Sequence, residues 1–154
     1  MNSEQMKLYK GVIPEITLKY KKGDVLKCKI RQSSDAVEVL RKFYDEDVFE
    51  LTETVIVLYL NAANNTIGWM KHSTGGTNQT VVDPKLVVGT ALKCGASAIL
   101  LSHNHPSGQT VPSSNDKDIT KMLKNGCDFF NILLIDHIIV TEDSYYSFGD
   151  EDEL

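Results

Sequence analysis

Apolar residues along the chain fall into runs and alternations that predict β-strands. The run at 55–60 is apolar throughout and β-branched at its start, which is typical of a central strand buried on both faces. Similar runs at 98–101 and 132–140 predict two more buried strands. The segments 66–74 and 145–148 predict a partner strand and a short final strand. The sequence therefore predicts a sheet with a strongly apolar centre.

Helical spacing of apolar residues separates these strands. Ser33-Ser34-Asp35 is expected to cap a helix that ends near Tyr44. Asp83-Pro84 offers an acceptor at the N-cap and proline at the first helical position, and this helix is expected to stop near Gly95. A third helix is expected from about residue 114, with Gly126 as its stop. Alternating strands and helices predict an α/β domain in which helices flank a mixed sheet.

The first part of the chain is different in character. Alternation of polar and apolar residues around Lys22-Gly23-Asp24 predicts a hairpin or two short strands. We expect one domain over residues 1–154, with a core at about 33–150 and basic strands at 1–32. The length of 154 residues is sufficient to bury one sizeable core.

Composition points to an ordinary globular protein, with 42% hydrophobic and 24% charged residues. No apolar run approaches the roughly 18 residues that span a bilayer, so we expect no membrane association. The first residues lack a basic-then-apolar export signal. Three widely separated cysteines, Cys28, Cys94 and Cys127, suit reduced thiols, which favours a cytoplasmic location. Cys94 and Cys127 are interpreted as packing residues.

Charge is unevenly distributed. Residues 1–31 carry eight Lys or Arg and three acids, a surplus of +5, so the rest of the chain sums to −10 within a net charge of −5. A basic arm could make a weak contact with nucleic acid. A lysine-rich strand edge that discourages aggregation is the alternative. The acidic body argues against a primary DNA binder.

The segment Ser102-His103-Asn104-His105-Pro106-Ser107-Gly108 carries the strongest chemical signal. Residues i and i+2 of an extended segment point to the same side, so His103 and His105 can face one point. The Pro-Ser-Gly turn then allows Asp116, near a helix start, to return to that point. Two imidazoles and one carboxylate suit Zn²⁺, although iron and manganese also accept such ligands. Three ligands leave a fourth position open for water, as in catalytic zinc sites.

Each part of this signal also has a simpler interpretation. Paired histidines in a polar loop are often only solvated, and Ser113 with Asp116 matches the helix capping box. A helix start can nevertheless position a ligand, so the two interpretations of Ser113 and Asp116 are compatible.

The sequence His-Asn-His-Pro-Ser-Gly, followed by Pro112-Ser113-Ser114-Asn115-Asp116, closely resembles the JAB/MPN metalloprotease (JAMM) motif in its bacterial RadC-like form. The resemblance covers about residues 45–150. It implies a three-layer α/β/α fold similar to that of cytidine deaminases. It also implies that His103, His105 and Asp116 bind zinc, and that Ser113 stabilises an oxyanion.

In this resemblance a glutamate from an early strand is the general acid and base. Glu53 occupies the matching position and Glu50 is the runner-up. The implied activity is a zinc metallopeptidase or isopeptidase that hydrolyses an amide bond of an unidentified peptide or protein. The alternative is a non-catalytic metal-binding module that acts in DNA repair, recombination or mobile-element maintenance. A nucleobase deaminase is disfavoured because its H-x-E motif with paired cysteines is absent.

The two remaining histidines, His72 and His137, are not expected to bind the metal. His137 lies inside a predicted buried strand beside Asp136 and is interpreted as a structural core histidine. His72 lies in a polar strand and is interpreted as exposed.

Overall fold

The computed structural model describes residue 20 and residues 27–75 and 81–154. A five-stranded sheet forms its centre, in the order β2-β1-β3-β4-β5. The strands are β1 (Thr54–Leu60), β2 (Thr66–Thr74), β3 (Ala98–Asn104), β4 (Leu133–Val140) and β5 (Tyr145–Ser147). The β3–β4 pair is parallel and the other pairs are antiparallel, so the sheet is mixed as predicted.

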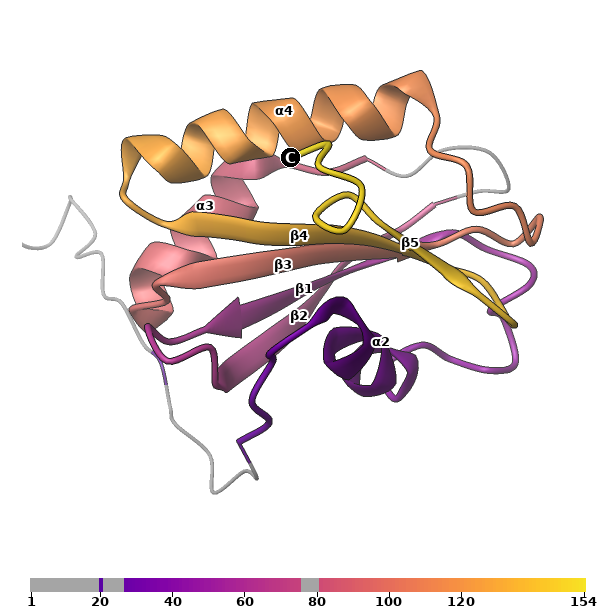
Figure 1. Cartoon of the computed structure of the whole chain (residues 1–154), viewed down its shortest axis with the longest axis horizontal. Helices are drawn as coiled ribbons and strands as arrows, with labels where there is room; N and C mark the ends of the chain where they lie inside the picture. The colour runs from indigo at the N-terminus through magenta and orange to yellow at the C-terminus, as the bar shows by residue number, and fades with distance from the viewer. Residues whose placement is uncertain (1–19, 21–26, 76–80) are drawn as a thin grey trace, which may run out of the picture.

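Helices cover both faces of this sheet (Figure 1). Helices α3 (Pro84–Cys94) and α4 (Ser114–Phe129) lie on one face, and α2 (Ser33–Arg41) lies on the other. The architecture is therefore the three-layer α/β/α arrangement expected from the sequence.

The two faces of strand β1 supply two separate cores. Val55, Val57 and Tyr59 pack with residues of α3 and α4, whereas Ile56 and Leu58 pack with residues of α2. All seven residues of β1 are buried, because the strand lies inside the sheet and has a helix layer on each side. Each face of the strand needs apolar residues, which explains its continuous apolar run.

Three boundaries, in two helices, differ from the predictions. Helix α4 continues through Gly126 to Phe129, because the cost of about 1 kcal/mol for a glycine in a helix is small beside the burial of Leu123 and Cys127 on either side of it. Helix α2 starts after Gln32, without a side-chain cap, and Asp35 instead accepts a hydrogen bond from the Arg31 N–H. Its end is at Arg41, earlier than predicted.

Helix α2 ends early because the two aromatic side chains that follow it contact strands β2 and β3 instead of continuing the helix. Phe43 stacks on Trp69 with ring centroids 4.3 Å apart. The hydroxyl of Tyr44 forms a 2.8 Å hydrogen bond with that of Ser102 on β3. Burial raises the pKa of Tyr44, so this phenol stays neutral at physiological pH.

Other boundaries agree with the sequence. Asp83 caps α3 through its side chain, which accepts from the Lys85 N–H, and Gly95 ends the helix with a left-handed φ of 68°. Cys127 is buried in the core and Cys94 packs against it, as expected for packing residues. In the described residues, no helix is long and apolar enough to cross a membrane.

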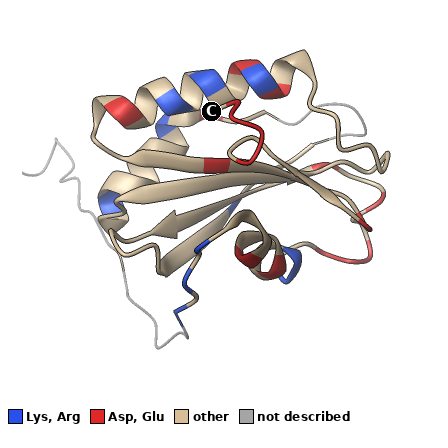
Figure 2. Ribbon diagram, in the orientation of Figure 1, with Lys and Arg blue, Asp and Glu red and all other residues tan. Residues whose placement is uncertain are grey.

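The predicted N-terminal hairpin lies almost entirely outside the described residues. Its end is visible at the edge of the sheet, where the Cys28 carbonyl accepts from the Thr66 N–H at 2.8 Å and Lys29 pairs with Asn65. In Figure 2 the ribbon of this short segment, which contains Lys27, Lys29 and Arg31, carries the blue of basic residues. The predicted nucleic-acid contact through the arm rests mainly on residues that the structure does not describe.

Candidate metal centre

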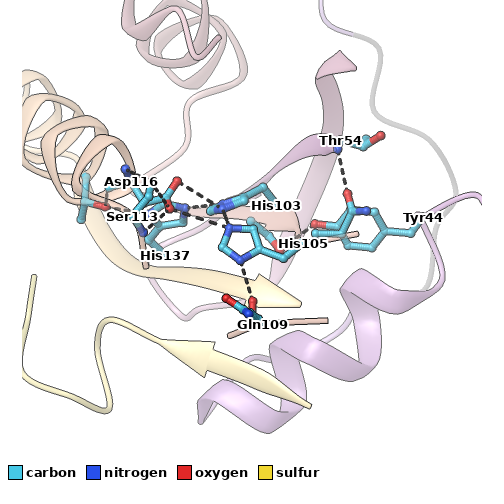
Figure 3. Close-up of polar contacts among 11 residues, drawn as sticks. Tyr44, Thr54, His103, His105, Gln109, Ser113, Asp116 and His137 are labelled. Carbon is cyan, nitrogen blue, oxygen red and sulfur yellow. Dashed lines mark hydrogen bonds and ion pairs between the residues drawn. The ribbon is translucent and has the colours of Figure 1, made fainter. Parts of the chain in front are cut away.

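Strand β3 positions both histidines of the motif. His103 is the penultimate residue of β3 and is 3% exposed. The chain stays extended for one more residue, because the His105 N–H donates to the Val140 carbonyl of β4 at 3.0 Å. The two imidazoles therefore leave the sheet on the same side (Figure 3).

Helix α4 positions the carboxylate. Asp116 is the third residue of the helix and forms a complete capping box with Ser113. Its Oδ2 accepts from the Ser113 N–H at 2.7 Å and from the Ser113 hydroxyl at 2.6 Å. These bonds fix the carboxylate in the first turn. The capping interpretation and the ligand interpretation of Ser113 and Asp116 are thus geometrically compatible.

The three predicted ligands converge on one point. The Nε2 atoms of His103 and His105 are 2.9 Å apart. The Nε2 of His103 is 3.3 Å from Asp116 Oδ1, and that of His105 is 3.7 Å from Oδ2. Zinc–ligand bonds of about 2.0–2.1 Å at tetrahedral angles would place ligand atoms about 3.3 Å apart. The observed separations scatter around this value, so the cluster has the size of a zinc site.

Hydrogen bonding also leaves the correct atom of His105 free. Its Nδ1 lies 2.7 Å from the Gln109 carbonyl oxygen, which can only accept a hydrogen bond. Nδ1 must therefore carry a hydrogen, which leaves Nε2 as the ring nitrogen that faces His103 and Asp116. This donor set fits a metal ion. Among the described residues, no fourth His, Cys, Asp or Glu joins the group.

Electrostatics favour the protonation states that a metal needs at two of the three candidate ligands. Burial lowers the pKa of His103 to about 4, against the opposing effect of Asp116, so the ring is neutral at pH 7. Burial alone would raise the pKa of Asp116, but the nearby imidazoles of His105 and His103 and the hydrogen bonds from Ser113 hold it well below its usual range. Metal ligands must be neutral imidazoles and ionised carboxylates. The cluster favours that form for His103 and Asp116.

Glu53 lies beside this cluster and outside it. It is half-buried, directly before β1, and β1 pairs with β3 so that Val55 lies opposite His103. Its charge acts on the site: burial alone would lower the pKa of His105, but Asp116 and Gln109, and after them the charge of Glu53, raise it. Glu50 is exposed and lines a separate cavity of about 200 Å³ with His105 and Glu142. Its carboxyl raises the pKa of Glu142.

Asn104 holds the segment that carries Glu53. Strand alternation turns its side chain away from the two histidines, and it is completely buried. Its Oδ1 accepts from the Thr54 N–H at 2.7 Å, and its Nδ2 donates to the carbonyls of Thr52 at 2.9 Å and Phe49 at 2.6 Å. One amide therefore binds the backbone on both sides of Glu53.

The two remaining histidines have different outcomes. His137 is a buried, fully hydrogen-bonded histidine as predicted, but its Nε2 contacts the Nδ1 of the ligand His103 at 2.9 Å. No spacing in the sequence indicates this contact, which depends on the parallel pairing of β3 and β4. The prediction that His72 is only exposed was wrong. Its Nε2 accepts from the Asp83 N–H at 2.9 Å, and its buried Nδ1 finds no partner among the described residues.

The fold and the cluster define an α/β protein with a candidate His-His-Asp metal centre at the end of a central strand. A match to the RadC-like JAB domain covers residues 30–154. The chain belongs to the RadC-like JAB domain family.

Several curated bacterial proteins are similar to most of this chain. A UPF0758 protein of Flavobacterium johnsoniae is 39% identical over 89% of this chain and 59% of its own length. Another, from Aquifex aeolicus, is 35% identical over 84% of this chain and 54% of its own length. A third, from Actinobacillus pleuropneumoniae, is 41% identical over 66% of this chain and 46% of its own length. The chain spans about half the length of these curated relatives.

Proposed function

We propose that this protein is a zinc-dependent hydrolase that cleaves an amide bond in a peptide or protein. The observation that carries the proposal is the convergence of His103 Nε2, His105 Nε2 and an Asp116 carboxylate oxygen on one point with no fourth protein ligand among the described residues. Catalytic zinc sites have three protein ligands and one open position, whereas structural zinc sites have four ligands. Family membership supports the same class of protein.

A zinc ion held there would act as a Lewis acid on the amide carbonyl and lower the pKa of a water molecule to about 7. Glu53 is the base in this proposal, since its charge reaches His105 from the strand next to β3. Its carboxylate would take the proton of the attacking water and later deliver it to the leaving nitrogen. Asn104 and the Gly75 N–H, which donates to the Glu53 carbonyl at 2.9 Å, hold the backbone of this residue in place.

Ser113 has two tasks in the proposal. Its hydroxyl donates to Asp116 Oδ2 at 2.6 Å and thereby orients the carboxylate. During hydrolysis the same hydroxyl would turn and donate to the oxygen of the tetrahedral species. One such donor typically contributes about 10²–10³ in rate. Ser113 is exposed, so a bound substrate can reach it.

Two variants test the proposal with zinc as the first probe. Wild type should contain one zinc per chain by elemental analysis, and His103→Ala should lose it. Glu53→Gln should retain the zinc and the melting temperature but lose hydrolysis of a mixed library of synthetic peptides and lysine isopeptides, read by mass spectrometry. Full hydrolysis by Glu53→Gln would remove this residue from the mechanism, and Glu50→Gln is the matched variant for the runner-up.

The second candidate function is a metal-binding module without turnover that acts in DNA repair, recombination or mobile-element maintenance. Basic residues at the described end of the N-terminal arm support it, since Lys27, Lys29 and Arg31 are all exposed. Neutralising Lys19, Lys21 and Lys22 in this arm should then weaken DNA binding, and the remaining affinity should fall steeply with salt. For either candidate, unpaired Cys28, Cys94 and Cys127 support a reducing, cytoplasmic site of action.

A further inference from the structure

Behind His103, on the side of the ring away from Asp116, lies a chain of buried hydrogen bonds. The Nδ1 of His103 is 2.9 Å from the Nε2 of His137. The Nδ1 of His137 is 2.6 Å from the Thr120 hydroxyl, which donates to the main-chain carbonyl of Asp116 at 2.6 Å. All three side chains are at most 3% exposed, so water does not compete for these bonds.

The direction of every bond in this chain follows from its last acceptor. A carbonyl oxygen can only accept, so the single hydrogen of the Thr120 hydroxyl points at Asp116. The hydroxyl oxygen must then accept from the Nδ1–H of His137. A neutral His137 with hydrogen on Nδ1 has a lone pair on Nε2, which must accept from the Nδ1–H of His103. His103 is left with a lone pair on Nε2, the atom that faces His105 and Asp116.

We infer that His137 and Thr120 are positioning residues for the metal centre, which select the ring tautomer of His103 that can bind a metal ion through Nε2. The inference rests on the zinc site of the proposed function, but it does not require hydrolysis. Outer partners of this kind typically change metal affinity by about 10- to 100-fold.

The same series of hydrogen bonds links two candidate ligands that come from different elements. It starts at His103 on β3 and ends on the backbone of Asp116 in the first turn of α4 (Figure 3). The ring of His137 is itself held by stacking on Phe148, with centroids 4.8 Å apart and planes 6° from parallel. These hydrogen bonds therefore fix the orientation of the His103 ring and also the position of the first turn of α4, which carries the Asp116 carboxylate, relative to β3.

A role for His137 as a fourth ligand does not fit this geometry. His137 contacts Nδ1 of His103, whereas the other ligands gather around Nε2 of the same ring. His137 is therefore separated from the cluster by the imidazole of His103. The position left open in the ligand set stays available to water.

The test compares Thr120→Val, which removes the hydroxyl at nearly constant shape, with Thr120→Ser, which keeps it. His137→Phe is the second variant, and it preserves the stacked ring next to Phe148. Zinc affinity is measured on the full chain by competition with a chelator, and urea unfolding gives the stability. NMR of protein with ¹⁵N-labelled histidine reports which ring nitrogen carries the hydrogen.

Thr120→Val and His137→Phe should bind zinc about 10- to 100-fold more weakly than wild type, and Thr120→Ser should bind it nearly as tightly. In metal-free wild type, His103 should carry its hydrogen on Nδ1, and Thr120→Val should shift it partly to Nε2. Unchanged zinc affinity in Thr120→Val, or hydrogen on Nε2 of His103 in wild type, would overturn the inference. Zinc binding with these effects but no hydrolysis would support the inference while refuting the proposed hydrolase.

Discussion

Asn104→Ala provides a quantitative test of how the Glu53 segment is held. The wild-type amide makes three hydrogen bonds of 2.6–2.9 Å to the backbone of residues 49–54, and it is completely buried. Alanine leaves the Thr54 N–H and two carbonyls without these partners. At about 1 kcal/mol for each bond, the free energy of unfolding should fall by about 3 kcal/mol. For a domain of this size, the melting temperature should fall by about 6–12 °C.

Asn61→Ala is the matched control. Asn61 also accepts two main-chain hydrogen bonds, from Ala63 and Asn65, but it lies in an exposed turn where water can replace them. It should lose about 1 kcal/mol or less. Urea unfolding of both variants gives the two free energies, with an unchanged slope against urea as evidence of the same folded state.

Hydrogen exchange adds a local measurement. The Thr54 amide should exchange faster in Asn104→Ala, and zinc content should stay at the wild-type level because no ligand has changed. If Asn104→Ala is no less stable than Asn61→Ala and the Thr54 amide stays protected, the three hydrogen bonds do not hold this segment.

Two other predictions concern helix α4 and helix α3. Gly126→Ala should raise the free energy of unfolding by about 0.5–1 kcal/mol, because Gly126 is inside a helix and a Cβ there would meet only Val88 at 3.8 Å. Gly95→Ala should lower the free energy of unfolding, because the φ of Gly95 is +68°. Equal effects of the two substitutions in urea unfolding would contradict this prediction. Burial lowers the pKa of His72 in the folded protein, so on acidification the unfolded chain binds a proton at His72 at a higher pH than the folded protein does. The hydrogen bond from the Asp83 N–H to His72 therefore stabilises the fold fully above about pH 6.5 and progressively less as the pH falls. The stability advantage of wild type over His72→Ala should therefore shrink on going from about pH 7.5 to about pH 5, and a constant difference would refute the assignment.

Local patterns were enough to predict most of the fold. The apolar run at 55–60 and the cap at Asp83-Pro84 each depend on residues near in sequence, and both elements lie where expected. The convergence of His103, His105 and Asp116 was predictable for the same reason, because strand alternation and one helix start place all three. The prediction that α4 stops at Gly126 was wrong, because a glycine in a helix costs only about 1 kcal/mol, and the packing of this 16-residue helix overcomes that cost.

Contacts between distant segments were beyond local patterns. The partners of Asn104 lie about fifty positions away, on a loop whose approach depends on the antiparallel pairing of β1 and β3. The contact of His137 with His103 depends likewise on the parallel pairing of β3 and β4. The aromatic packing of Phe43 on Trp69 is such a contact, and helix α2 ends at Arg41, before the predicted end near Tyr44.

The three candidate ligand atoms all come from residues 103–116, which run from the end of β3 into the crossover to its parallel neighbour β4, whereas Glu53 directly precedes β1, the antiparallel neighbour on the other side of β3. In the proposed function, ion binding and proton transfer are therefore encoded by separate parts of the chain. On that proposal, a descendant could exchange the Glu53 carboxylate for a neutral side chain and keep its ion, and so bind a substrate without cleaving it.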